Sequence, residues 1–112
     1  MIALVPAIVL HYCRRSFCSI ARRLTPTQLF THVACPTLII PAELPPADQR
    51  AAEWLDRKRR AVAVAEATME HARVVWAHDT VHDVQLQRPE WLASELVAFA
   101  REIRMRCDNQ NR

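Results

Sequence analysis

The stretch that decides the fold runs from Trp76 to Phe99 and reads WAHDTVHDVQLQRPEWLASELVAF. The apolar residues at and just before its start predict a short strand over residues 73–76, and the polar residues that follow predict a loop over residues 77–88. Pro89 suits the first turn of a helix, where its missing N–H has no partner to lose. Strand, loop and helix are therefore expected in that order, with two His-Asp pairs in the loop.

The expected helix after Pro89 has one apolar face. Its apolar residues recur at intervals of four, three and four positions, which is the spacing of a helix face: Leu92, Leu96, Phe99 and Ile103. Glu90 lies near the start and three arginines lie near the end, so that the charges complement the helix dipole. We therefore expect an amphipathic helix with one apolar face.

A short helix and a second strand are expected upstream. Thr25-Pro26-Thr27-Gln28 is a capping-box pattern with proline at the first helical position, which predicts a helix to about Thr31. Residues 33–40 then predict a strand that Pro41 ends. Its apolar run at residues 37–40 is typical of a parallel strand covered on both faces.

Residues 47–72 are rich in alanine, glutamate and arginine and predict a long helix. Its expected buried face carries the following residues: Trp54, Ala61, Val62, Ala65 and Met69. The charge run at residues 56–60 is expected to be solvated, because acidic and basic residues alternate around it. The order strand, helix, strand, helix predicts an α/β unit with two parallel strands joined by a right-handed crossover.

Two segments in this order resemble the α/β-hydrolase family. VHDVQLQRPEWLASELVAF, residues 81–99, resembles the closing segment of that family, in which a His-Asp pair precedes a helix that begins with proline. LFTHVACPTLIIPAE, residues 29–43, resembles its penultimate strand with the Cys-Pro-Thr start. The resemblance covers residues 26–104 and implies a partial α/β-hydrolase fold, with the last two parallel strands and their flanking helices.

The resemblance also implies a domain organisation. A complete member of the family is at least twice as long as these 112 residues, so we expect a C-terminal part of such a domain over residues 25–106. An apolar and basic helical segment is expected at residues 1–24, and a polar tail at residues 107–112.

The activity that the resemblance implies is hydrolysis of a small ester-like or amide-like substrate through an acyl-enzyme, without a cofactor. His82 aligns with the catalytic base of the family, and Glu43 is the first choice for the carboxylate that orients it, with Asp48 as the second. No nucleophile can be assigned. Arg15 and Phe17 flank Ser16, where the nucleophile elbow needs small residues, and both Ser16 and Ser19 lie too close to the penultimate strand. We therefore expect the chain alone to be inactive.

The chain contains no glycine. This excludes the Gly-x-Ser-x-Gly nucleophile elbow, the Walker phosphate loop and the dinucleotide fingerprint within the chain, because each needs a close backbone approach that only glycine permits. It also means that backbone positions with positive φ must be occupied by residues such as asparagine or aspartate.

A competing hypothesis takes His78, Asp79, His82 and Asp83 as metal ligands, because on a helix they would share one face. The β-branched pair at residues 80–81 follows a strand and disfavours such a helix, so we expect no metal site. The net charge of +3 is too small to indicate a nucleic-acid partner.

The competing function class is a non-catalytic association module, in which exposed sheet edges pair with a partner or a second copy. The apolar start of the chain, about ten residues, is shorter than the roughly 20 that a transmembrane helix needs. The four cysteines show no Cys-x-x-Cys pair and are expected to be buried thiols in a reducing compartment, with Cys35 in the core. A cytoplasmic location follows as the expectation.

Overall fold

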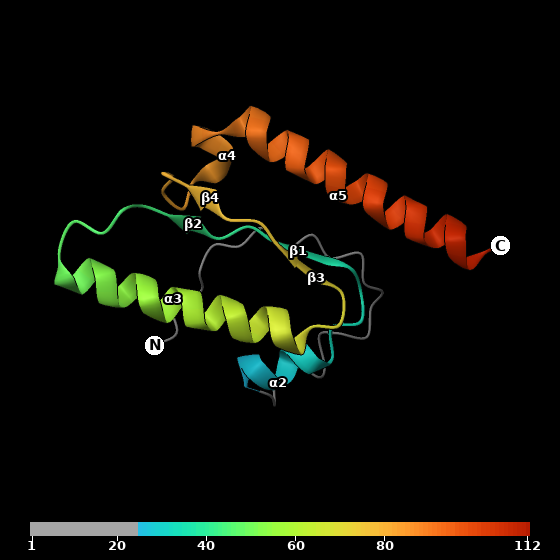
Figure 1. Ribbon diagram of the computed structural model, residues 1–112, viewed down its shortest axis with the longest axis horizontal. Coiled ribbons are helices and arrows are strands. Elements are labelled where there is room, and N and C mark those ends of the chain that lie inside the picture. The colour runs from blue at the N-terminus through green and yellow to red at the C-terminus, as the bar shows by residue number, and fades with distance from the viewer. Residues whose placement is uncertain (1–24) are drawn as a thin grey trace.

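Two chain segments separated by 35 residues pair in parallel at the centre of the structure, a computed structural model that describes residues 25–112 (Figure 1). Strand β1 (Thr37–Ile39) pairs with β3 (Ala72–Val74), and β2 (Ala42–Glu43) pairs with β4 (Ala77–His78). All five register pairs have the same offset along the chain. The parallel arrangement predicted from the sequence is therefore confirmed.

Pro41 separates the two small sheets. The N–H of Val75 donates to the oxygen of Ile39 at 3.0 Å, and the N–H of Ala77 donates to the oxygen of Pro41 at 2.8 Å. In a regular parallel ladder the N–H of residue 41 would complete the series, but proline has none. The two sheets are thus one parallel ribbon with a missing hydrogen bond.

Two sequence predictions about these strands are wrong in their bounds. The strand expected over residues 33–40 is only β1, because residues 33–35 turn away from the preceding helix; the N–H of Val33 bonds to Phe30 at 3.2 Å. Pairing also resumes after Pro41. The loop expected over residues 77–88 begins with β4 and contains the short helix α4 (Val84–Gln87).

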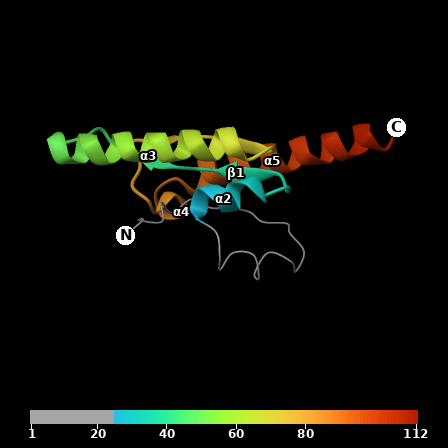
Figure 2. The same cartoon turned by 90° about the horizontal axis from the view of Figure 1, so that it is seen from below.

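Helices cover both faces of the ribbon (Figure 1). Helix α3 (Gln49–Thr68) lies on one side together with α2 (Pro26–Thr31), and α5 (Pro89–Gln110) lies on the other. Figure 2, which looks from the side of α2 and α3, shows β1 between these two helices in the view and part of α5 behind. Within the described residues the fold is a mixed α/β arrangement of four helices and two small two-stranded parallel sheets.

Successive strand residues point to opposite faces, and each face has its own core. Leu38, Ile40 and Ala42 pack toward α5. Ile39 packs toward α2 and α3, next to Cys35. The expectation that Cys35 is a core residue is confirmed, although it precedes β1. Burial on both faces explains the continuous apolar run that predicted a parallel strand.

The capping box at α2 is present as predicted, with the N–H of Gln28 bonded to the Thr25 hydroxyl at 3.3 Å and the N–H of Thr25 bonded to the Gln28 side chain at 2.9 Å. The apolar face of α5 is also confirmed, because Leu92 and Phe99 are buried and the other two predicted residues, Leu96 and Ile103, are half-buried against the same core.

The predicted face of α3 is correct in its second half and wrong in its first. Val62, Ala65 and Met69 are buried, whereas Trp54 is exposed and Ala61 is exposed. The buried face continues instead through Leu55 and Lys58, which keep the alternating three- and four-residue spacing. A lysine in that stripe hid the pattern, and the expectation that the whole charge run is solvated is wrong for Lys58.

Some expectations fall outside the described residues: the helical segment at 1–24 with Ser16 and Ser19, and two of the four cysteines. Cys107, expected to be buried, is exposed because it lies near the end of α5, beyond the core. Between residues 25 and 112 no helix is both long and apolar enough to cross a membrane.

The core assignment predicts the effect of truncating Leu38. Leu38→Ala should lower the free energy of unfolding by about 2–5 kcal/mol, because it removes an almost completely buried side chain from the core under α5. Leu86→Ala is the matched control, since Leu86 is exposed, and it should change the free energy by less than about 0.5 kcal/mol. Urea denaturation measures both, and equal losses would contradict this placement.

Candidate functional site

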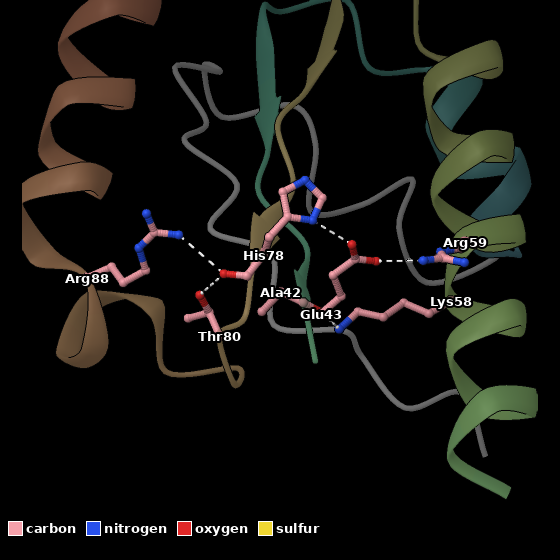
Figure 3. Close-up of polar contacts among 7 residues, drawn as sticks. All are labelled: Ala42, Glu43, Lys58, Arg59, His78, Thr80 and Arg88. Atoms are coloured by element: carbon pink, nitrogen blue, oxygen red, sulfur yellow. Dashed lines mark hydrogen bonds and ion pairs between the residues drawn. The ribbon is translucent and has the colours of Figure 1, made fainter. Parts of the chain in front are cut away.

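A carboxylate and an imidazole meet at the carboxyl ends of the two paired segments (Figure 3). Glu43 ends β2 and His78 ends β4, and the two residues are register partners. Partners in a ladder direct their side chains to the same face of the sheet, which brings the His78 Nδ1 atom to 2.6 Å from the Glu43 Oε1 atom. Carboxyl ends of parallel strands are where open α/β sheets place their ligand sites.

The Glu43 carboxylate is held from two sides. Its second oxygen, Oε2, lies 3.2 Å from the Nη2 atom of Arg59 on α3, and its side chain is 16% exposed. Burial by itself raises the pKa of Glu43, but the hydrogen bonds and charges of His78 and Arg59 outweigh this, so that the pKa lies below its ordinary value. The carboxylate is therefore ionised at neutral pH and accepts hydrogen bonds from both partners.

The imidazole of His78 is open to solvent on its other side. Its side chain is 68% exposed, although Nδ1 is engaged with Glu43. An ionised carboxylate can only accept, so Nδ1 carries the hydrogen in the neutral ring and Nε2 presents its lone pair. This arrangement can take a proton from a bound molecule at Nε2, which is the geometry of a histidine base oriented by a carboxylate.

Two donors hold the backbone of His78 on the side away from Glu43 (Figure 3). The Thr80 hydroxyl donates to the His78 carbonyl oxygen at 2.8 Å, and the Nη1 atom of Arg88 donates to the same oxygen at 3.2 Å. Arg88 in turn lies over the ring of Trp91, with 5.0 Å to its centroid. The N–H of Thr80 donates to the Glu43 carbonyl oxygen at 3.1 Å, which ties the two strand ends together.

Asp79 makes the turn that follows β4. Its φ is 53°, the one positive φ at a non-glycine residue in the described part of the chain. Aspartate tolerates this left-handed region better than most residues do. The expectation that asparagine or aspartate must serve such positions in a chain without glycine is confirmed here.

Helix α3 contacts the strand end through two consecutive residues. Next to Arg59, the ammonium of Lys58 donates to the Ala42 carbonyl oxygen and lies 5.1 Å from the centroid of the Trp54 ring. Lys58 is only 7% exposed. Burial lowers the pKa of Lys58, and the attraction of Glu43 opposes this shift in part.

Two open depressions flank the pair and share Glu43, Arg59 and His78 in their walls. One has a volume of about 340 Å³ and is completed by Val62, Ala63, Glu66 and Trp76. The other has a volume of about 300 Å³ and is completed by Leu44, Pro45, Pro46, Leu55 and Asp79. Among the described residues, no serine, threonine or cysteine lines either depression.

Of the three residues predicted for the site, the structure places one, Glu43, at the site and the other two, His82 and Asp48, elsewhere. Glu43 is at the centre of the site. His82 is exposed, and its Nε2 atom lies 3.4 Å from the Asp83 Oδ2 atom, so the structure brings Glu43 together with His78 and leaves His82 with its sequence neighbour. Asp48 caps α3, with its carboxylate accepting from the N–H of Ala51 at 2.7 Å.

Sequence reasoning considered His78 only as a metal ligand. The signal that could have identified it as the partner of Glu43 is the common offset between the two paired chain segments. That offset is hard to see in the sequence, because the start and end of each strand are not evident there. Residues 25–112 contain no group of three or more His, Cys, Asp or Glu side chains placed to hold a metal ion.

Comparison with known proteins adds no relative: no family model matches the chain, and no match was found among curated proteins or among solved structures.

The lowered pKa of Glu43 predicts how stability depends on pH. A carboxyl group whose pKa is lower in the folded than in the unfolded chain stabilises the fold above the unfolded value of 4.5, and this stabilisation is lost as the pH falls through the folded value. The wild type should therefore be more stable than Glu43→Gln at pH 7, and the difference should shrink in acid. Urea denaturation at several pH values measures it, and a difference that stays constant with pH would contradict the ion pairing.

Proposed function

We propose that this chain is the C-terminal part of an α/β-hydrolase-type unit and supplies the acid–base half of its site. The observation that carries the proposal is the Glu43–His78 pair, with 2.6 Å between the carboxylate oxygen and Nδ1, at the carboxyl ends of two parallel strands. The order of the strands and helices and the resemblance of residues 26–104 support the same reading. The mixed α/β arrangement agrees with it at a coarse level.

The chemistry proposed is hydrolysis of an uncharged ester or amide bond. His78 takes a proton from a nucleophile or water at Nε2 and returns it to the leaving group, while Glu43 holds the ring and stabilises the imidazolium that forms. The two depressions beside the pair combine apolar residues, such as Trp76 and Leu55, with charged ones, and offer room for a small substrate. A nucleophile has to come from outside the described residues or from a separate polypeptide, and no cofactor is required.

Two histidines compete for the role of base. The resemblance assigns it to His82, whereas the geometry favours His78, because only His78 contacts a carboxylate that is itself held by α3. The assignment of His82 stays a prediction of the resemblance. Because the two imidazoles are similarly exposed, a chemical assay can separate them.

Hydrolysis of nitrophenyl acetate tests the proposal. Without its nucleophile the chain should show only the slow hydrolysis of this activated ester in which an imidazole assists the attack of water. His78→Gln and Glu43→Gln should each lower the second-order rate constant roughly threefold or more, because a carboxylate-held imidazole is the more effective base. His82→Gln and the control His71→Gln, which removes another exposed histidine beside a glutamate, should leave the rate constant within about 1.5-fold.

Three outcomes would overturn parts of this proposal. A lower rate constant in His82→Gln but not in His78→Gln would identify His82 as the base, as the resemblance implies. Equal rates in all variants would exclude an acid–base role for the pair. Fast turnover with a burst of nitrophenol would show a complete site within the chain.

A second candidate function is association through a sheet edge. It is favoured by the partial exposure of β3 and by its outer backbone groups, which are unpaired within residues 25–112. Its residues are half-buried along the whole strand, and the backbone groups of Ala72 and Val74 point away from β1, where no strand of the described residues pairs with them. Leu38 and Ile40, whose backbone groups point outward from β1, are almost completely buried, in contrast to the half-buried residues of β3. Between β1 and β3, the β3 edge is therefore the more accessible one for pairing.

Association by this route predicts a dimer that a single proline disrupts. Val74→Pro removes an outward N–H from the edge and should shift the sedimentation of the chain from dimer to monomer. The control is Val97→Ser, which changes an exposed valine on α5 and should leave a dimer intact. A wild-type chain that sediments as a monomer at high concentration would exclude this function.

A further inference from the structure

Two consecutive residues of α3 contact two consecutive residues of β2 at the site. Lys58 donates to the Ala42 carbonyl oxygen, and Arg59 bonds to the Glu43 carboxylate at 3.2 Å. The two contacts differ in their surroundings, since the side chain of Arg59 is 58% exposed whereas Lys58 is buried. An exposed ion pair contributes little to holding a geometry, so the buried contact is the firmer of the two.

The contact of Lys58 acts on the backbone that carries Glu43. The carbonyl oxygen of Ala42 belongs to the peptide group that joins Ala42 to Glu43. A donor on that oxygen fixes the plane of the peptide and with it the direction in which the Glu43 side chain leaves the strand. The Trp54 ring, 5.1 Å from the ammonium, holds Lys58 from its other side.

The ladder itself provides less restraint at this point. Pro41 contributes no N–H to it, and only two residues remain between the interruption and the end of β2. The ladder resumes on either side of Ala42, through the Pro41 and Glu43 carbonyl oxygens, but neither bond reaches the Ala42 carbonyl oxygen. Lys58 provides the contact to that oxygen, which explains why the chain retains a charged group in a buried place where it is costly.

We infer that Lys58 is a positioning residue that directs the Glu43 carboxylate toward Nδ1 of His78. It lines neither of the two depressions and touches neither ring nor carboxylate by hydrogen bond. The importance of this role for catalysis rests on the proposed function. The orientation itself can be measured without any substrate.

The measurement is the tautomer of His78, read from the ¹⁵N chemical shifts of its ring at about pH 9, where imidazoles are neutral. The wild type should hold the hydrogen on Nδ1, because Glu43 accepts it, and Glu43→Ala should release the ring into a mixture of tautomers. Lys58→Met should lose at least about half of the Nδ1–H preference, moving toward the Glu43→Ala value. Arg60→Met is the matched control, since it removes a charge from the exposed face of the same helix, and it should keep the wild-type tautomer.

Amide chemical-shift dispersion shows whether each variant is folded. If Lys58→Met does not fold, Lys58→Gln takes its place, because its side chain is one atom shorter and uncharged while remaining polar. A folded Lys58 variant with the wild-type tautomer would overturn the inference, whatever the rates of ester hydrolysis. A shifted tautomer with unchanged hydrolysis in every variant would instead support the positioning role and count against the proposed function.

Discussion

The register of the parallel ribbon is the constraint on which the rest of the structure depends. One offset holds for all five residue pairs of the two strand pairs, and it places Glu43 opposite His78 at the end of the ribbon. A slip of one residue would turn each strand residue to the other face of the sheet and would separate the pair. The alternating burial of Leu38, Ile39 and Ile40 on opposite faces prevents such a slip, because each face has its own apolar core.

The chain builds this ribbon without glycine and with a proline inside it. Pro41 removes one hydrogen bond but leaves the register unchanged, since the ladder continues through its carbonyl oxygen. The sharp turn after β4 is made by Asp79 at positive φ. Near the end of the ribbon, side chains add contacts to the backbone bonds: Lys58 from α3, and Thr80 and Arg88 beyond β4.

The two side chains of the pair differ in their exposure to solvent, and this difference decides how each takes part in the hydrogen bond. The carboxylate of Glu43 is mostly buried, yet it stays ionised because Arg59 and His78 donate to it. The imidazole is mostly exposed, so one nitrogen is committed to Glu43 and the other faces solvent. A buried acceptor beside an exposed ring is what allows a single orientation of the ring to be maintained at the surface.

The sequence by itself determined the local elements of this protein. The capping box at Thr25, the apolar face of α5, the two strand segments and their parallel order were all predictable, because each signal lies within a few residues of chain or follows from the order of elements. The need for a residue such as Asp79 at positive φ was predictable from the missing glycine alone. Glu43 could be named as the orienting carboxylate only through the resemblance, because it lies in the segment just after the expected strand; the structure places it at the end of β2.

Only the tertiary structure decided which histidine lies beside Glu43 and which charge is buried. His78 and His82 are both followed by aspartate in one loop-like segment, and only the register across 35 residues brings one of them into contact with the carboxylate. Lys58 occupies the buried stripe of α3 because the Ala42 carbonyl oxygen is there to accept its hydrogen, a partner sixteen residues away. Contacts between distant segments select among locally equivalent residues, and no pattern within either segment contains that information.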